Sequence, residues 1–277
     1  MTLITGHKGF IGSHLVENKL DYIGYDLKDG QDIRNKYQLA KIFANNNIKT
    51  VIHLAAEAGV RRGEKYSDEY ISTNINGTRN LLELAEEYNV KHFIFFSSSS
   101  VYGEQKPPLK EDMRLQPTSL YGTTKLTGEL LCRISPVPIT IIRPFSVYGE
   151  NGRGDQVLYK WIHQLEAKEP VSFYGDGSTI RGYIYVKDLI LGLAYIISRK
   201  EDVEFEVFNL GGQEKITLND LYKLFKERYP WMEKNIIPLP KVDVKANWAD
   251  ISKAKKQLKW SPHTNFNKKI KELLWKM

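Results

Sequence analysis

Short apolar runs alternate with stretches of helical periodicity over the first 145 residues, and this alternation limits the possible folds more than any other feature. The runs that read as strands are Met1–Thr5, Tyr22–Tyr25, Thr50–Leu54, His92–Phe96 and Ile139–Ile142. Strands that are apolar throughout and separated by helices are typical of a parallel sheet covered on both faces. The sequence therefore predicts a doubly wound α/β fold.

Helices are expected between these strands. They are predicted from the glycine-rich turn after the first strand to about Leu20, over Ile33–Ala44, as one long helix to about Tyr88, and over Leu120–Arg133.

The pattern loosens after residue 145. Short strands are expected at Val171–Tyr174 and Ile184–Val186, a helix over Lys187–Ser198, another from Leu218, and two short helices near the end. We expect residues 1–145, together with about 184–210, to form the sheet domain. Residues from about 146 to 183 and from 211 to 277 are expected to form a smaller lobe over the carboxyl edge of the sheet.

The charge of the chain is concentrated at one end. Among 277 residues, 40 Lys and Arg face 33 Asp and Glu, giving +7. From Lys241 onward ten lysines face Asp243, Asp250 and Glu272, so this tail carries the whole excess. Such a tail can bind nucleic acid. A solvated helical surface is favoured instead, because arginine and interleaved aromatic residues are scarce there, and no nucleic-acid partner is expected.

Two observations bear on the compartment. No apolar run approaches the roughly 20 residues that span a bilayer, and the segment MTLITGHKGF lacks the apolar core of a signal peptide, so no membrane partner is expected. The single cysteine, Cys132, excludes an intrachain disulfide framework. A cytoplasmic location is therefore expected.

A glycine-rich turn joins the first strand to the first helix. Gly6, Gly9 and Gly12 form a GxxGxxG motif, and glycines at this spacing allow a tight turn and a close approach of the backbone to a pyrophosphate. Asp26 ends the second strand, where a carboxylate accepts hydrogen bonds from an adenosine ribose and repels a 2′-phosphate. The sequence therefore predicts NAD, rather than NADP, as cofactor.

Candidate catalytic groups follow the fourth strand and open a helix. Tyr121 and Lys125 are four residues apart on one helical face, so the ammonium can stabilise a tyrosinate, and the charge of oxidised nicotinamide adds to this effect. The serine run Ser97–Ser100 follows a buried strand, where its hydroxyl groups would emerge beside the expected cofactor crevice.

Taken together, these motifs resemble the extended short-chain dehydrogenase/reductase family. The resemblance rests on TGxxGxxG, HLAA (53–56), SSSSVYG, YxxxK, NINGT (74–78), RPFSVYG (143–149), RGYIYVKD (181–188), FNLGG (208–212) and DISKA (250–254), and so covers nearly the whole chain. It implies a Rossmann-type NAD-binding domain, a nucleotide-sugar-binding lobe and a homodimer formed through two helices per subunit.

The resemblance also implies roles for individual residues. Ser98 matches the catalytic hydroxyl, Tyr121 the base and Lys125 its partner. The loop after Asp26 is shorter than in family members, which puts Asp32 or Ile33 near the adenine. The expected NAD-binding residues are Gly6, Lys8, Gly9, Phe10, Ile11, Gly12, Asp26, Asp32, Ile33, Leu54, Ala55, Ala56, Asn74, Tyr121, Lys125, Pro144 and Phe145.

Neighbouring residues indicate which reaction the resemblance implies. Sugar 4,6-dehydratases carry an Asp-Glu pair after the catalytic hydroxyl, and UDP-glucuronate decarboxylases carry a Glu, where this chain has Ser99 and Ser100. NAD-dependent 4-epimerisation of a UDP-sugar, through a transient 4-keto sugar, is therefore expected. The alternatives are an NAD(P)H-dependent 4-keto nucleotide-sugar reductase and a non-catalytic NAD-binding or nucleic-acid-binding protein.

The substrate side is most similar to UDP-glucuronate 4-epimerases, with UDP-hexose or UDP-hexosamine as alternatives. The expected substrate-binding residues are Arg61, Ser98, Ser99, Ser100, Ser146, Arg153, Tyr174, Arg181 and Asp243. Three residues differ from the pattern of these relatives. Glu150-Asn151 replaces Pro-Trp and adds negative charge near the expected anion site, Gly182 replaces an aspartate, and an arginine before Asp243 is missing, for which Lys241 is a possible substitute.

Overall fold

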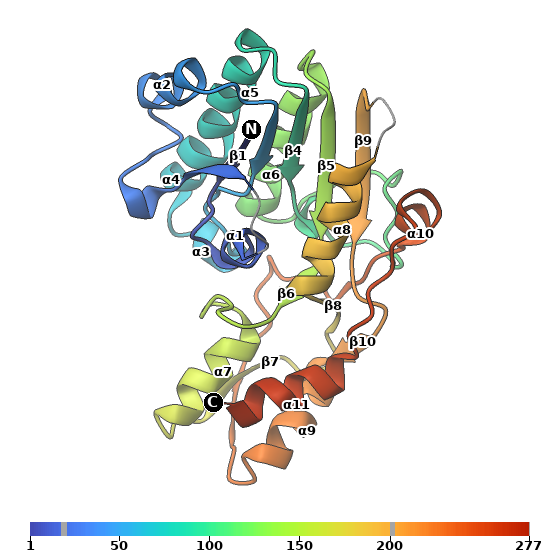
Figure 1. The fold of residues 1–277 in the computed structure, drawn as a ribbon. Coiled ribbons are helices and arrows are strands. Elements are labelled where there is room, and N and C mark those ends of the chain that lie inside the picture. The colour runs from blue at the N-terminus through green and yellow to red at the C-terminus, as the bar shows by residue number, and fades with distance from the viewer. Residues whose placement is uncertain (18–20, 200–202, 277) are drawn as a thin grey trace.

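A six-stranded parallel sheet forms the upper part of the molecule (Figure 1). The computed structural model describes residues 1–17, 21–199 and 203–276. The strand order is β2-β1-β3-β4-β5-β9, and the strands are β1 (Thr2–Thr5), β2 (Tyr22–Tyr25), β3 (Thr50–His53), β4 (His92–Phe96), β5 (Ile139–Pro144) and β9 (Phe205–Leu210). The predicted doubly wound α/β fold is confirmed.

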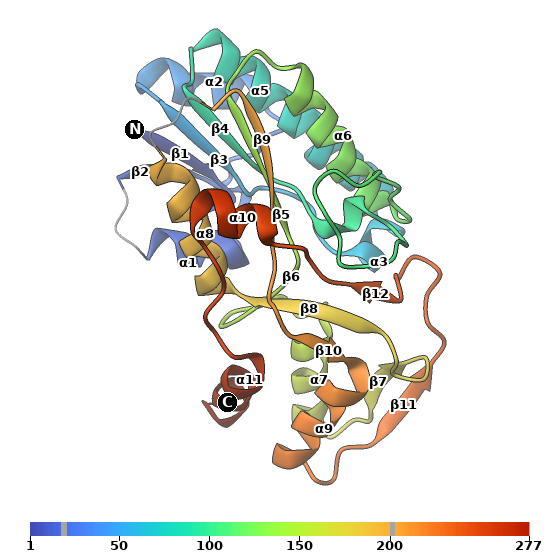
Figure 2. The same ribbon diagram turned by 90° about the vertical axis from the view of Figure 1, so that its right-hand side faces the viewer.

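Helices cover both faces of this sheet (Figure 2). One face carries α2 (Lys36–Asn45), α5 (Thr78–Glu87) and α6 (Leu120–Ile134), and the other carries α1 (Phe10–Val16), α8 (Val186–Ser198) and α10 (Ser252–Leu258). Successive strand residues point to opposite faces, so Phe93 and Phe95 pack in one core cluster while Ile94 packs in the other. Burial on both faces explains why the strands are apolar throughout.

The predicted long helix up to Tyr88 is present only as a continuous helical stretch from Ser67 to Glu87, and it contains a π-helical turn. The segment is divided into α3 (Val60–Gly63), α4 (Ser67–Ile71), the π-helical turn η2 (Ser72–Gly77) and α5. In the π turn the buried Asn74 side chain bonds the backbone N–H and C=O of Glu57, at 2.8 and 2.9 Å. Helical periodicity does not reveal this division, because the apolar residues keep their spacing across it.

Two predicted boundaries also need correction. The helix expected from Ile33 begins at Lys36, because the Asn35 side chain caps it by accepting a hydrogen bond from the backbone N–H of Gln38. The strand expected at 184–186 is β8 (Ile180–Tyr185), and Val186 already begins α8. The predicted end of the first helix near Leu20 falls outside the described residues, and α1 is described to Val16.

The lower part of the molecule contains two small sheets and three helices (Figures 1 and 2). Strand β8 pairs with β6 (Ser146–Tyr148), β10 (Lys215–Thr217) and β12 (Ala246–Asn247), and β7 (Val171–Tyr174) pairs with β11 (Lys234–Ile237). The helices are α7 (Val157–Glu166), α9 (Leu218–Arg228) and α11 (Phe266–Lys276).

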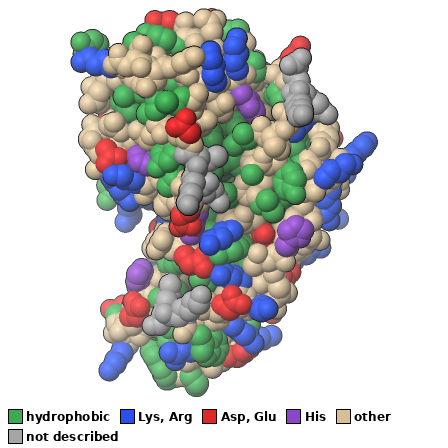
Figure 3. Space-filling model, in the orientation of Figure 1, with side chains coloured by type: hydrophobic (Ala, Val, Ile, Leu, Met, Phe, Trp, Pro, Cys, Tyr) green, Lys and Arg blue, Asp and Glu red, His purple; other side chains and the backbone are tan. Residues whose placement is uncertain are grey.

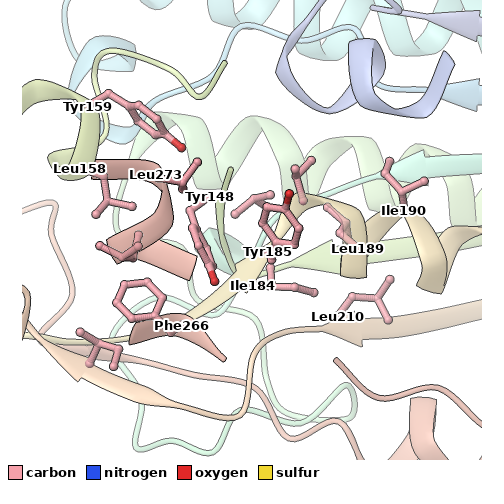
Figure 4. Packing of buried hydrophobic residues seen from close by; sticks show 14 of the residues in the cluster. Tyr148, Leu158, Tyr159, Ile184, Tyr185, Leu189, Ile190, Leu210, Phe266 and Leu273 are labelled. Atoms are coloured by element: carbon pink, nitrogen blue, oxygen red, sulfur yellow. The ribbon is translucent and has the colours of Figure 1, made fainter. Parts of the chain in front are cut away.

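One helix of the predicted lower lobe packs on the large sheet instead. In α10, Ala254 and Leu258 are buried, and Lys253 Nζ donates to the carbonyl of Val207 in β9 at 2.8 Å. Apolar packing also continues through the junction below α8, where Tyr148, Ile184 and Phe266 lie together with Leu189 and Leu210 (Figure 4). No helix in the described parts of the chain is long and apolar enough to cross a membrane.

A polar cluster around Glu150 ties the two parts together. Glu150 Oε1 pairs with Lys269 Nζ of α11 at 2.9 Å, and Oε2 accepts from Tyr185 Oη at 2.8 Å. Its backbone carbonyl accepts from His14 Nε2 of α1 at 2.7 Å. Three separate segments therefore meet at one carboxylate residue.

Two lysines of the last helix pair with acidic side chains of other segments. Besides the pair between Lys269 and Glu150, Lys271 Nζ pairs with Glu227 of α9 at 2.7 Å. On the face shown in Figure 3, blue and red side chains are interspersed over the lower part of the molecule. The positive charge of the tail is thus partly balanced by carboxylates that come from other segments.

We predict that Glu150 makes stability sensitive to acid. Burial alone would raise its pKa, but hydrogen bonds from Lys269, a backbone amide and Tyr185 lower it to about 2 from 4.5. A depressed folded-state pKa adds stability above pH 4.5 that is lost as the pH falls toward 2. Thermal unfolding followed from pH 7 downward should lose less stability over this window in Glu150→Gln than in wild type. An equal loss of stability in the variant and in wild type would show that Glu150 is not responsible for the sensitivity to acid.

Candidate active site

Three adjoining cavities extend from the carboxyl edge of the large sheet into the lower part of the molecule. They have volumes of about 200, 310 and 210 Å³, and we name them after one lining residue each: the Asp26, Tyr121 and Arg181 cavities. Gly6, Gly9, Leu54 and Ala56 line both the Asp26 and Tyr121 cavities. Ser146, Val147 and Gln156 line both the Tyr121 and Arg181 cavities. The three therefore form one groove, as expected where parallel strands end.

The glycine turn forms the floor of this groove. Gly6 has a φ of +74°, and a Cβ there would lie 2.6 Å from the backbone nitrogen of Ala55. A Cβ on Gly12 would lie 2.2 Å from the carbonyl oxygen of Gly6. Glycine at position 6 therefore allows the close approach to Ala55, just after β3, and glycine at position 12 allows helix α1 to lie against the carbonyl of Gly6.

We predict that Gly12→Ala weakens NAD binding by tenfold or more, on the order of 1.4 kcal/mol. The added methyl group must displace the backbone of Gly6, and with it the floor of the groove. Titration with NAD measures the effect. Gly154→Ala is the matched control, because its Cβ would lie no closer than 3.6 Å to any neighbour. Equal NAD affinity in the Gly12 variant and wild type would refute this role of the turn.

Asp26 lies in the first cavity with both carboxylate oxygens already accepting backbone amides. Oδ2 accepts from Lys8 N at 2.8 Å and Oδ1 from Lys28 N at 2.9 Å. The carboxylate is thus fixed in position, with lone pairs left for a further donor. Two other predicted residues, Asp32 and Ile33, also line this cavity. Arg34 lines it as well, although the sequence did not indicate this residue, and its Nη2 pairs with Asp32 Oδ2 at 2.6 Å.

Two predicted cofactor residues do not line any of the three cavities. The Lys8 side chain pairs with Asp29, and only its backbone amide serves Asp26. Asn74 bonds Glu57 as described above and also donates to Thr124 Oγ1 at 3.0 Å. Lys8 therefore contacts Asp26 through its backbone alone, and Asn74 connects the π turn to Glu57 and to helix α6. The other predicted cofactor residues all line the groove: Gly6, Gly9, Phe10, Ile11, Gly12, Asp26, Asp32, Ile33, Leu54, Ala55, Ala56, Tyr121, Lys125, Pro144 and Phe145.

Ser98, Tyr121 and Lys125 all line the central cavity. Helix α6 begins here because the Ser119 side chain accepts from the backbone N–H of Gly122 at 3.1 Å. This cap places Tyr121 in the first turn and Lys125 one turn further on. Lys125 Nζ donates to the carbonyl of Phe96 in β4 at 2.7 Å, which ties the helix to the strand that carries Ser98.

Burial opposes the ionised forms of both Tyr121 and Lys125. It raises the pKa of the Tyr121 phenol, while the Arg153 charge and a hydrogen bond shared with Ser98 act in the opposite direction. Burial also lowers the pKa of Lys125 to about 8. The chain by itself therefore keeps Tyr121 as a phenol at neutral pH, and a tyrosinate needs a further positive charge in the cavity.

A buried ion pair that sequence reasoning missed lies directly behind these groups. Glu129, one turn after Lys125, pairs with Arg143 through two contacts of 2.9 and 2.7 Å. Its Oε1 also accepts from Ser97 Oγ at 2.5 Å. The side chains of Glu129 and Arg143 are only 6% and 4% exposed. Ser97, the neighbour of Ser98, is thus held by a charged pair that joins α6 to β5.

Arg153 is a second charged group of the central cavity, besides Lys125. It lines the cavity with Ser99, Ser100 and Ser146. Asp155 holds its guanidinium through Nε at 2.9 Å and Nη2 at 3.0 Å, which leaves Nη1 as a donor. Glu150, which the sequence placed near this group, pairs with Lys269 instead, so the expected negative charge at this site is wrong.

The Arg181 cavity brings together the remaining predicted substrate residues. Arg61, Tyr174, Arg181 and Asp243 line it, although they come from distant parts of the chain. Arg61 pairs with Asp243 and stacks on the Tyr174 ring, 3.7 Å from its centroid. Arg181 donates to the backbone carbonyls of Ile180 and Val244. Lys241 is exposed and is not among the residues that line this cavity.

Comparison with known proteins identifies the family. Residues 2–211 match the model of the NAD dependent epimerase/dehydratase family. A UDP-glucuronate 4-epimerase of Thermodesulfobacterium geofontis is 34% identical over 304 residues, covering 97% of this chain and 93% of the relative.

Solved structures give the same result. A UDP-glucuronic acid 4-epimerase from Bacillus cereus, in complex with UDP-glucuronic acid and NAD, has a TM-score of 0.90 at 32% identity and covers 99% of each chain. A UDP-glucose 4-epimerase from Thermotoga maritima with UDP-glucose has a TM-score of 0.89 at 29% identity, covering 99% of this chain and 97% of the other. The resemblance seen in the sequence motifs is confirmed, and the chain belongs to the NAD dependent epimerase/dehydratase family.

Proposed function

We propose that this protein is an NAD-dependent 4-epimerase that acts on a UDP-sugar. The observation that carries the proposal is one groove holding Ser98, Tyr121 and Lys125 at its centre, with a cavity on either side of them. Ser99 and Ser100 stand where dehydratases and decarboxylases of the family carry an acid. The similar 4-epimerases described above support the same reaction.

The residues around the first cavity fit NAD. The fixed Asp26 carboxylate retains lone pairs for the two hydroxyl groups of an adenosine ribose, and its charge disfavours a 2′-phosphate. The glycine turn leaves room for the pyrophosphate, and Lys125 and Pro144 line the cavity beyond it. When bound, NAD supplies the hydride acceptor and donor for carbon 4 of the sugar.

Tyr121 is the proposed acid and base. It removes the proton of the sugar 4-hydroxyl, directly or through Ser98, and returns a proton after the 4-keto sugar has turned its other face. Burial keeps Tyr121 protonated in the chain alone, and Tyr121 would ionise more readily beside the positive charge that oxidised NAD would supply. Tyr121 is therefore expected to act as a base more readily with oxidised cofactor bound.

The far cavity is the proposed site of the UDP group. Arg181 and Arg61 supply positive charge for a diphosphate, and Asp243 supplies an acceptor for ribose hydroxyls. Between this cavity and Tyr121, Arg153 and the hydroxyl groups of Ser99 and Ser146 would surround the substituent on carbon 5 of the sugar. These groups suit a carboxylate, so UDP-glucuronate is the preferred substrate.

Incubation of the protein with UDP-glucuronate, UDP-glucose and UDP-N-acetylglucosamine, with the 4-epimer of each as readout, tests this function. We expect epimerisation, fastest for UDP-glucuronate, with no net change in NADH absorbance. Stoichiometric consumption of NAD(P)H would indicate a keto reductase instead. No product from any of the three sugars would refute the proposal.

Further features of the proposed enzyme follow from composition and surface. Residues 1–145 and about 184–210 are proposed as the NAD-binding domain, with the remainder, except α10, as the sugar-nucleotide lobe.

Helix α6 exposes the side chains of Leu130 and Ile134, which are 54% and 80% accessible to solvent. Exposed apolar residues on this face favour a homodimer formed through α6, which light scattering can test. The single buried cysteine favours the cytoplasm, and no nucleic-acid partner is proposed for the lysine-rich tail.

A further inference from the structure

Asn247 contacts the active-site serines from a distant part of the chain. It belongs to β12, where it pairs in register with Arg181 of β8, and its side chain is buried. Its Nδ2 donates to Ser99 Oγ at 3.3 Å. Its Oδ1 has no hydrogen-bond partner among the described residues.

The orientation of this amide follows from its surroundings. With the amide turned over, the buried position without partners would hold an NH₂ group with two unsatisfied donors. A buried carbonyl oxygen without a partner is tolerated better than a buried N–H. The amide therefore presents its nitrogen to Ser99 and its oxygen to the unpartnered side.

The strand that carries Asn247 is held firmly. Leu109 N donates to the carbonyl of Trp248 at 2.9 Å, and Asp250 N donates to the carbonyl of Leu109 at 2.8 Å. On the other side, Lys245 N donates to Glu104 Oε2 at 2.9 Å. Contacts on both flanks fix the backbone, so Asn247 keeps its position relative to Ser99.

The contact with Asn247 determines what Ser99 offers to a substrate. A hydroxyl group has one proton to donate, and Ser99 receives the Asn247 proton on its oxygen. No acceptor for the proton of Ser99 lies among the described residues, and Ser99 lines the Tyr121 cavity. Its proton can therefore be donated to a ligand in this cavity, which Arg153 also lines with Nη1 as a remaining donor.

We propose that Asn247 is a specificity-determining positioning residue, which makes Ser99 a hydrogen-bond donor and so selects UDP-sugars with a carboxylate on carbon 5. A carboxylate only accepts hydrogen bonds, whereas a hydroxymethyl group brings a proton of its own and does not need this donor. The inference rests on the proposed function, since it concerns the same sugar site.

Asn247→Asp tests the inference, because aspartate has nearly the same shape but only accepts. In this variant Ser99 donates its proton to the new carboxylate and turns its lone pairs to the cavity. We expect the ratio of kcat/KM for UDP-glucuronate to that for UDP-glucose to fall by about tenfold or more. The dissociation constant of UDP should stay within about twofold of wild type, because Arg181 keeps its own backbone contacts.

Two controls separate specificity from structure and from charge. Asn235→Asp makes the same chemical change at an exposed position of β11 and should leave the ratio unchanged. Asn247→Asp in a Ser99→Ala background should change the ratio much less than in wild type, since the effect passes through Ser99.

Several outcomes would overturn the inference. Equal losses for both sugars, accompanied by weaker UDP binding, would show a purely structural role for Asn247. An undiminished effect without Ser99 would show that Asn247 acts directly or by charge. A wild-type preference for UDP-glucose would also contradict it while leaving the epimerase proposal intact. If no UDP-sugar is epimerised, the ratio of the two substrate dissociation constants gives the same test without turnover.

Discussion

Tyr121→Phe is expected to lower kcat by about 10²- to 10⁴-fold, the usual contribution of a general base. The variant loses the phenol oxygen that takes the sugar 4-hydroxyl proton, and the described residues that line the Tyr121 cavity include no carboxylate and no imidazole. Binding of NAD and UDP should stay within about twofold of wild type, because neither the glycine turn nor Arg181 contacts the lost atom. Steady-state kinetics with UDP-glucuronate measures the change.

Tyr37→Phe is the matched control for this prediction. Tyr37 is 74% exposed on α2, so the same substitution there should leave kcat unchanged. Undiminished turnover in the Tyr121 variant would refute its assignment as the base. A loss of NAD binding equal to the loss of turnover would show instead that Tyr121 serves to hold the cofactor.

The second large effect concerns stability. Glu129→Gln should lower the free energy of unfolding by about 3–5 kcal/mol, the usual cost of breaking a buried ion pair. Glutamine keeps the shape of the side chain but leaves the buried Arg143 guanidinium without its counter-charge. Denaturant unfolding measures the change. Turnover should also fall, because Ser97 loses its charged acceptor next to Ser98.

A double variant separates the cost of an unpaired charge from the cost of lost packing. Glu129→Leu combined with Arg143→Met removes both charges together, and such replacements are often neutral or stabilising. It should therefore recover much of the stability lost in the single variant. If Glu129→Gln costs less than about 1 kcal/mol, as exposed pairs do, the pair does not stabilise the site as argued.

Local patterns were sufficient to predict the sheet and the centre of the site. The five strands predicted in the first half are all present, because burial on both faces leaves a run of apolar residues that periodicity detects. Gly6, Ser98 and Tyr121 lie just after strands or in the first turn of a helix. At such positions a short motif is sufficient to predict where the residue lies relative to the sheet. Placing these residues needed only neighbouring positions in the chain.

Features that join distant segments could not be predicted in this way. Asn247 reaches Ser99 across 148 positions, and Arg61 pairs with Asp243 across 182. Neither contact can be detected from the local periodicity of the sequence. The sequence around Glu150 predicts a position beside the anion site. In the structure, however, Glu150 pairs with Lys269 of the last helix. Charge pairing across the fold, and not the local motif, decides where such side chains lie.

The most direct test of the proposed enzyme is the approach to equilibrium from both sides. The protein is incubated with catalytic NAD and either UDP-glucuronate or its 4-epimer, and both nucleotide sugars are quantified over time. We predict that the two reactions converge on one ratio, with no net NADH formed at the end. Failure of either sugar to convert, or conversion in step with net reduction or oxidation of the cofactor, would contradict the assignment.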